Sequence, residues 1–136
     1  MSDWAPIEAE GGMRHSNGPP AVRAGDFVFL SSVKGVDPGT QVSDHDVYKQ
    51  LRQAMANIDV VLEAAGLDKG DIIKVTIYLE GFGENRRLLD LVWGEYFEGY
   101  PPARATVSVD SVGVASDPSV ALFDVVAWRQ SDAGLT

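Results

Sequence analysis

Residues 44–66, DHDVYKQLRQAMANIDVVLEAAG, and residues 71–82, DIIKVTIYLEGF, carry the strongest structural signal in the chain. Apolar side chains recur every three or four residues in the first segment, which is typical of a helix buried along one side. Ser43 or Asp44 can cap its start, and Gly66 can end it. The second segment is rich in β-branched residues and predicts a strand. The inward stripe of the helix is Val47, Leu51, Met55, Ile58, Leu62 and Ala65.

The flanking segments add a hairpin, a second helix and two more strands. A Gly-Asp turn divides residues 21–32 into two strand-like pieces, and residues 84–99 predict a helix with Leu88, Leu89, Val92 and Phe97 inward. Residues 103–109 and 119–128 predict strands. This order of elements predicts an α+β fold in which both helices pack on one face of a mixed sheet.

The whole chain, residues 1–136, is expected to form a single domain. Residues 1–12 are expected to be a loose N-terminal arm, and residues 130–136 a frayed tail. Alternate residues of the early strand are apolar on both of its faces, since Phe27 and Phe29 share one face and Val28 and Leu30 the other. Two helices cannot cover both faces of such a sheet. We therefore expect a second copy of the chain to cover the other face.

The composition excludes several classes of function. Eleven basic and 20 acidic residues give a net charge of −9, which opposes binding to nucleic acid or to an anionic membrane. The chain contains no cysteine, so disulfides and thiolate chemistry are absent. We find no leader-like segment and no apolar run of membrane-spanning length, and expect a soluble cytoplasmic protein. The spacing of Asp44, His45 and Asp46 is poor for a metal site.

Arg104 opens the strand at residues 103–109 and is the first candidate site residue. Alternation places Ala105, Val107 and Val109 on one face, which we expect to point into the core. Arg104, Thr106 and Ser108 then share the other face and offer a cation beside two hydroxyls. A guanidinium carries paired donors that match a carboxylate. The alternative is an ordinary exposed arginine at the end of a strand.

Asp124 is the second candidate because it interrupts the apolar run VALFDVVAW. A carboxylate in such a run is costly unless it is paired. If residues 105–109 and 119–128 form antiparallel neighbours, Asp124 lies close to Arg104 or to its ligand. It would then act as an acid or base beside an anion clamp. A structural salt bridge, or an acid facing solvent at the sheet edge, would explain it equally well.

The chain resembles the Rid (YjgF-like) family of reactive-intermediate imine and enamine deaminases. The motifs that carry the resemblance are AGDFVFLSS, the block LRQAMANIDVVLEAAGLDKGDIIKVTIYL, and PPARATVSV followed by an acid in the last strand. They occur in the family's order from Gly18 to Arg129. The resemblance implies a chorismate-mutase-like fold that assembles as a homotrimer, with active sites in clefts between subunits.

The resemblance also implies a reaction and the residues that perform it. Arg104 would bind the carboxylate of the substrate, and Asp124 would position water. Ser31, Ser32 and Thr106 would line the pocket. The reaction would be hydrolysis of 2-imino or enamine acids, released by pyridoxal-phosphate enzymes such as threonine or serine dehydratases, to 2-keto acids and ammonia. No cofactor is needed for it.

The chain departs from the family pattern at several of these positions. Pro20 follows Gly18 and Pro19 where the family has a pocket tyrosine, Asp124 replaces a glutamate, and Asp90 replaces a frequent asparagine. Such changes fit a specialised pathway enzyme, such as an aminomuconate-type deaminase or an acid–base tailoring enzyme, or a regulatory protein that binds small carboxylates. His15 belongs to a segment that we expect to be exposed, although it could enter the cleft in place of the tyrosine.

Overall fold

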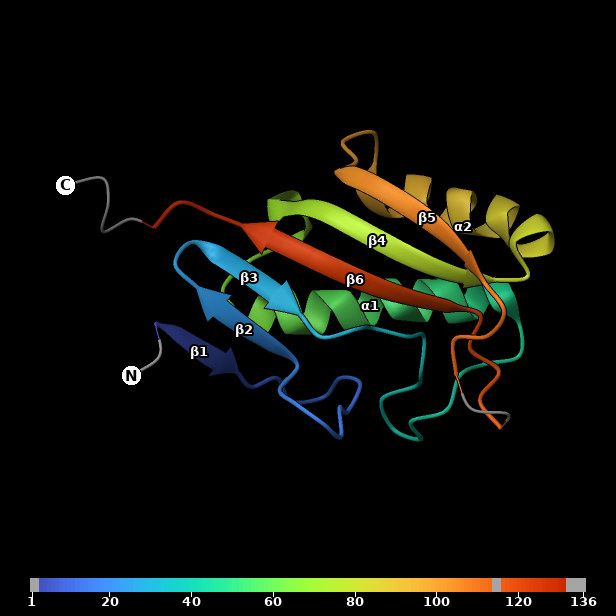
Figure 1. Cartoon of the computed structure of the whole chain (residues 1–136), viewed down its shortest axis with the longest axis horizontal. Coiled ribbons are helices and arrows are strands. Elements are labelled where there is room, and N and C mark those ends of the chain that lie inside the picture. Colours follow the sequence, from blue (N-terminus) through green and yellow to red (C-terminus); the bar gives the residue numbers. More distant parts are fainter. Residues whose placement is uncertain (1–2, 114–115, 132–136) are drawn as a thin grey trace.

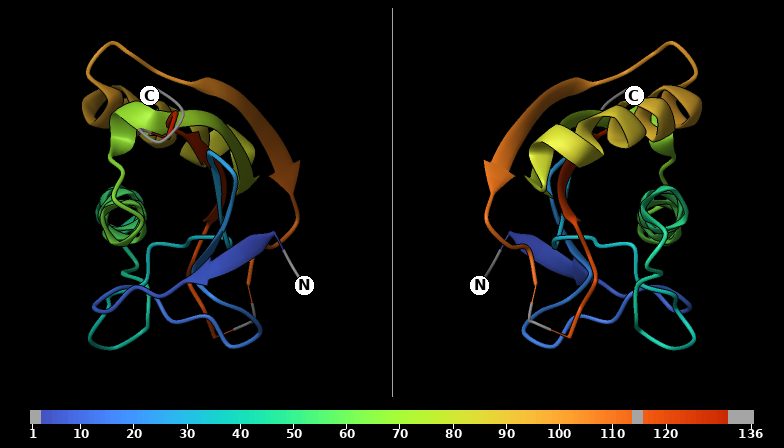
Figure 2. Two further views of the ribbon diagram at one scale, coloured as in Figure 1. Left: turned by 90° about the vertical axis from the view of Figure 1, so that its left-hand side faces the viewer. Right: turned by 90° about the vertical axis from the view of Figure 1, so that its right-hand side faces the viewer.

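Two helices cover one face of a mixed sheet, as the sequence predicts (Figure 1). The structure is a computed structural model that describes residues 3–113 and 116–131. Figure 2 shows both helices on the same side of the sheet. The sheet of the described residues has six strands in the order β1-β2-β3-β6-β4-β5. The elements are β1 Trp4–Ile7, β2 Ala21–Ala24, β3 Phe27–Leu30, α1 Val47–Ala64, the short 3₁₀ helix Lys69–Asp71, β4 Ile72–Glu80, α2 Phe82–Phe97, β5 Ala103–Val109 and β6 Ala121–Trp128.

The amphipathic pattern of α1 buries the predicted stripe against the sheet. Leu51, Met55, Ile58 and Leu62 are buried, as is Ala65 at the end of the helix. The expected start of the helix is wrong by a few residues. Asp46 caps it by accepting a hydrogen bond from the Lys49 amide, while the side chain of Ser43 bonds Ser119 instead. Gly66 follows the last turn with φ +76°, as expected for the residue that ends a helix.

Strand β6 lies in the middle of the sheet, between β3 and β4. It runs antiparallel to both, whereas β5 pairs with β4 in parallel after the α2 crossover. The condition for a contact between Asp124 and Arg104, that residues 105–109 and 119–128 are antiparallel neighbours, is therefore not met, because β4 separates β5 from β6. The central position of β6 explains its near-continuous apolar sequence, and Phe123 at its middle is fully buried.

The expectation of a loose N-terminal arm is wrong for residues 4–7. They form β1, which pairs antiparallel with β2 at the edge of the sheet. Pro6 cannot donate to a ladder and so suggests a loop, but an edge strand tolerates it. At the other end, the amide of Ser131 donates to Asp26 Oδ1 at 3.0 Å. The remainder of the predicted tail, residues 132–136, lies outside the described residues.

The face of the sheet opposite the helices is apolar and open, which confirms that the strands are hydrophobic on both sides. Strand register places large hydrophobic side chains from β1, β3, β5 and β6 on this face. We call this the open face, and its exposed apolar members are Trp4, Phe27, Phe29, Val107 and Trp128. In the described part of the chain, no helix is long and apolar enough to cross a membrane.

Buried polar side chains of α1 hold the loop that follows β3 and the loop that leads into β6. Asn57 donates to the carbonyls of Lys34 and Val36 at 2.9 and 2.8 Å, and Gln50 donates to Pro118 at 2.9 Å. Gly35 lies so close to α1 that a Cβ there would stand 1.9 Å from the Gln50 carbonyl oxygen. The loop can therefore reach α1 only with glycine at this position.

Gly35→Ala is expected to lower the free energy of unfolding by about 1–3 kcal/mol, because the added methyl group forces the loop away from α1. Gly94→Ala is the matched control. Nothing lies within 4 Å of a Cβ at that helical position, so alanine there should add about 0.5–1 kcal/mol. Urea denaturation of both variants measures the difference. Equal stability of the Gly35 variant and the wild type would contradict the close packing.

Candidate functional site

Arg104 is held in place by side chains of its own chain. Its Nε donates to Thr106 Oγ1 at 2.8 Å, and its Nη2 lies 2.8 Å from Asp90 Oδ1 on α2. The guanidinium carbon lies 4.9 Å from the centre of the Trp93 ring, within the range of a cation–π interaction. The arginine side chain is 20% exposed. These contacts fix the orientation of the guanidinium before any ligand arrives.

The predicted direction of Arg104 is wrong. Parallel pairing puts Arg104 in register with Val75 and Thr106 with Ile77, both of which are buried beneath the helices. Arg104 and Thr106 therefore point to the helix side, and Val107 points to the open face. Strand β5 is at the edge of the sheet, and its helix-side residues Arg104 and Thr106 are only partly buried, so polar side chains are tolerated there.

Asp124 points to the opposite side of the sheet. It pairs in register with Thr76 on the open face, where it is exposed. No side chain of the described residues forms an ion pair with it. Arg104 and Val125 flank Val75 in register, so their backbones lie about 10 Å apart, two strand spacings. Within a single chain, the two predicted catalytic residues therefore lie on opposite faces of the sheet.

Ser31 and Ser32 lie beside Asp124 rather than beside Arg104. They follow β3 between the paired residues Phe29–Val126 and Val33–Phe123, and so run alongside Val125 and Asp124. Ser31 Oγ donates to the Pro19 carbonyl at 2.6 Å. Both serines line a cavity of about 520 Å³ that extends to Leu122, which shares the open face with Asp124.

His15 also belongs to this cavity, so the expectation that it is exposed is wrong. Its Nε2–H donates to the Ser32 carbonyl at 2.7 Å, and its Nδ1 is buried without a hydrogen-bond partner among the described residues. The sequence shows a lone histidine in a glycine-rich arm and gives no signal for this contact.

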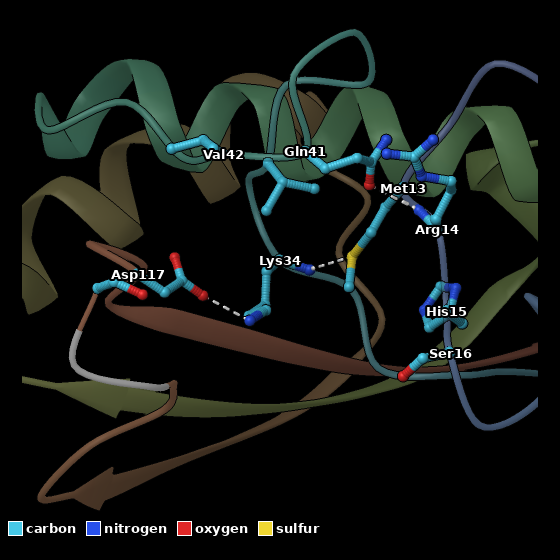
Figure 3. Close-up of a pocket in the computed structure, with 10 residues that line it drawn as sticks. Met13, Arg14, His15, Ser16, Lys34, Gln41, Val42 and Asp117 are labelled. Atoms are coloured by element: carbon cyan, nitrogen blue, oxygen red, sulfur yellow. Dashed lines mark hydrogen bonds and ion pairs between the residues drawn. The ribbon is translucent and has the colours of Figure 1, made fainter.

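A second cavity of about 590 Å³ adjoins the first (Figure 3). Lys34 and Asp117 both line it and form an ion pair, with Lys34 Nζ 2.6 Å from Asp117 Oδ2. Burial raises the pKa of Asp117, but hydrogen bonds from Lys34 and Ser119 outweigh it and hold that pKa below its ordinary value. This pair leaves no local signal in the sequence, because its members lie far apart in the chain and meet only through the loops on α1.

Asp90 is the carboxylate that the fold places beside Arg104. In the sequence it stands out only as a departure from the family pattern. Asp90 and Trp93 are three residues apart, about one helical turn. This spacing is the one local signal that the two side chains could face the same neighbour. Among the residues described here, no group of three or more histidine, aspartate and glutamate side chains could hold a metal ion.

Comparison with known proteins confirms the resemblance. The chain belongs to the Endoribonuclease L-PSP family, whose model matches residues 15–119. Protein DfrA of Myxococcus xanthus is 41% identical over 92 residues, which cover 67% of this chain and 70% of that protein. A RutC family protein of Pyrococcus horikoshii is 39% identical over 90 residues, 65% of this chain and 71% of the relative. The 2-iminobutanoate/2-iminopropanoate deaminase of Dermatophagoides farinae is 33% identical over 90 residues, again 65% of this chain and 70% of the relative.

Solved structures share the whole fold. The yjgF gene product of E. coli superposes with a TM-score of 0.83 at 25% identity, covering 93% of this chain and 99% of that one. YyfA of Yersinia pestis, described as a conserved Rid family protein, gives a TM-score of 0.82 at 27% identity, covering 93% and 99%. The chain is therefore a Rid family protein with the α+β fold of that family.

Asp117→Asn is expected to lower the free energy of unfolding at pH 7 by about 1–3 kcal/mol, because hydrogen bonds to a charged group are lost. The folded pKa lies below the ordinary value of 3.8. The stabilisation is thus complete above that value and is lost as the pH falls through the lower, folded pKa.

Urea denaturation of wild type and variant at pH 7 and in acid checks this pH dependence. Asp110→Asn, a change at an exposed aspartate, is the control and should have little effect at either pH. A deficit in the Asp117 variant that stayed the same in acid would show that the ion pair is not its cause.

Proposed function

We propose that the protein hydrolyses 2-imino or enamine acids to 2-keto acids and ammonia, in a cleft completed by a second copy of the chain. The observation that carries the proposal is the guanidinium of Arg104, pre-oriented by Thr106, Asp90 and Trp93 in a Rid family chain. The names of two relatives, reactive intermediate deaminase A of Arabidopsis thaliana and the Dermatophagoides farinae deaminase, support this reaction class.

Arg104 would bind the carboxylate of the substrate. Its Nε and Nη2 contact Thr106 and Asp90, and Nη1 has no partner among the described residues. The Nη1 edge can therefore donate to a carboxylate, to which guanidinium is geometrically matched. Since the guanidinium is already oriented, little side-chain entropy is lost when the ligand binds.

Asp124 would position the attacking water, with Ser31 and Ser32 lining the pocket beside it. The water oxygen bonds to the carbon of the protonated imine and gives a carbinolamine. The C–N bond then breaks, both water protons end on nitrogen, and a 2-keto acid and ammonium result. The imine carbon is already electrophilic, so the protein needs mainly to hold the carboxylate and the water in contact.

The two halves of this site require two copies of the chain. Arg104 points to the helix side at the edge of the sheet, and Asp124 points out from the open face. The open face exposes aromatic side chains of β1, β3 and β6, which favours burial against another copy. Arg104 from one copy and Asp124 from the next would then face one substrate. A closed ring, a trimer by the family resemblance, satisfies this geometry.

The net charge of −9 disfavours the polyanionic substrate suggested by the word endoribonuclease in the family's name. A small carboxylate needs only one well-placed cation, which Arg104 supplies. We place the reaction in the cytoplasm as part of the proposal.

Arg104→Ala is expected to lower the rate of imine hydrolysis by about 100-fold or more, because the substrate is no longer held in register with the water. An amino-acid oxidase would generate several 2-imino acids, and semicarbazide would trap whatever survives. Arg87→Ala, which removes an exposed arginine of α2, is the matched control and should keep wild-type activity.

Wild-type activity in the Arg104 variant would contradict its role as the clamp. If wild type and buffer gave equal trapping with every imino acid, general deaminase activity would be excluded. Thermal stabilisation of such an inactive wild type by a small carboxylate would instead indicate a binding protein.

A further inference from the structure

The guanidinium of Arg104 is paired with a carboxylate of its own chain before any substrate binds. Asp90 Oδ1 lies 2.8 Å from Arg104 Nη2, and Asp90 remains about half exposed. The second oxygen, Oδ2, lies 3.6 Å from Arg86 Nε one helical turn away. Asp90 therefore bridges two arginines, and the three charges sum to one positive charge.

This arrangement distinguishes two classes of ligand by their charge. A simple 2-keto acid brings only a negative charge, which Arg104 attracts and Asp90 repels. A 2-imino acid with a protonated nitrogen brings a positive charge next to its carboxylate. In such a ligand the nitrogen lies a short distance from the nearest carboxylate oxygen. That distance is comparable with the 2.8 Å between Arg104 Nη2 and Asp90 Oδ1. The two ends of such a ligand complement the two members of the ion pair.

We propose that Asp90 is a specificity-determining residue that directs the Arg104 site to 2-iminium and 2-amino carboxylates over 2-keto carboxylates. The inference rests on the proposed function, since it assumes that Arg104 binds the carboxylate. The ligand carboxylate would take the Nη1 edge of Arg104, while the cationic nitrogen donates to Asp90. A carboxylate has about four acceptor positions, so Asp90 can accept this bond and keep its contact with Arg104.

The same residue would favour release of the product. Hydrolysis replaces the cationic nitrogen with a neutral carbonyl oxygen, which offers no donor to Asp90. The product carboxylate then faces the charge of Asp90 without compensation. Substrate would therefore be held more tightly than product at one and the same arginine.

A purely structural role for Asp90, holding Arg104 in position, predicts something different. Asparagine keeps an acceptor oxygen for Nη2 and nearly the same shape but removes the charge. If Asp90 only positions Arg104, Asp90→Asn should alter the binding of both ligand classes alike. If it selects the cationic nitrogen, the two classes should change in opposite directions.

The test compares 2-oxobutanoate with 2-aminobutanoate, a stable zwitterion that stands for the iminium acid, by isothermal titration calorimetry. In Asp90→Asn, 2-oxobutanoate should bind about fivefold more tightly or better, because a full charge close to its carboxylate is removed. 2-Aminobutanoate should bind more weakly. Glu84→Gln, the same change of charge on α2 at a residue with no ion pair among the described residues, should leave both Kd values unchanged.

Equal shifts in the Kd of both ligands, or no shift in either Kd, would overturn the proposal. So would a result in which one of the ligands binds neither wild type nor Asp90→Asn. Asp90→Glu keeps the charge and should retain the preference for the zwitterion. Arg104→Ala separates the two claims. If it bound both ligands as wild type does, the carboxylate clamp would be wrong, whatever Asp90 does.

Discussion

The parallel pairing of β5 with β4 determines the side of the sheet on which Arg104 lies. Register with Val75 turns the arginine toward α2, where Trp93, Asp90 and Thr106 fix its guanidinium. The same register leaves the apolar residues of β5 on the open face. Both the prepared cation and the β5 part of the exposed hydrophobic surface therefore follow from one backbone pairing, and with them the separation of Arg104 from Asp124.

The cavities near Ser31 and Lys34 depend on a different constraint, the packing on α1 of the loop after β3 and of the loop before β6. Asn57 and Gln50 satisfy backbone groups that would otherwise be buried without partners. Gly35 permits the close approach of the first loop that makes the Asn57 bonds possible. The helix that carries the hydrophobic core therefore also shapes the walls of the cavities, so the stability of the fold and the geometry of the site are coupled through the same side chains.

Local patterns in the sequence were enough to predict both helices, every strand except β1, the buried stripe of α1, its end at Gly66 and the two apolar faces of the sheet, because each of these features depends on residues close together in the chain. Alternation shows that Arg104 and Val107 point to opposite faces but not which face meets the helices. That depends on strand order, and hence on pairing between distant segments. The contacts of Asp90 with Arg104, Lys34 with Asp117 and His15 with Ser32 are equally long-range. Strand β1 was missed because Pro6 masks its pattern.

The central claim is that Arg104 of one copy and Asp124 of another act on the same substrate, and complementation tests it most directly. Arg104→Ala and Asp124→Asn chains, each inactive alone, would be unfolded together, refolded as mixed oligomers and assayed for imine hydrolysis. A shared site is intact only where an Arg104 from one variant meets an Asp124 from the other, so random mixing should restore about a quarter of wild-type activity. No recovered activity in mixed oligomers of proven composition would contradict the account.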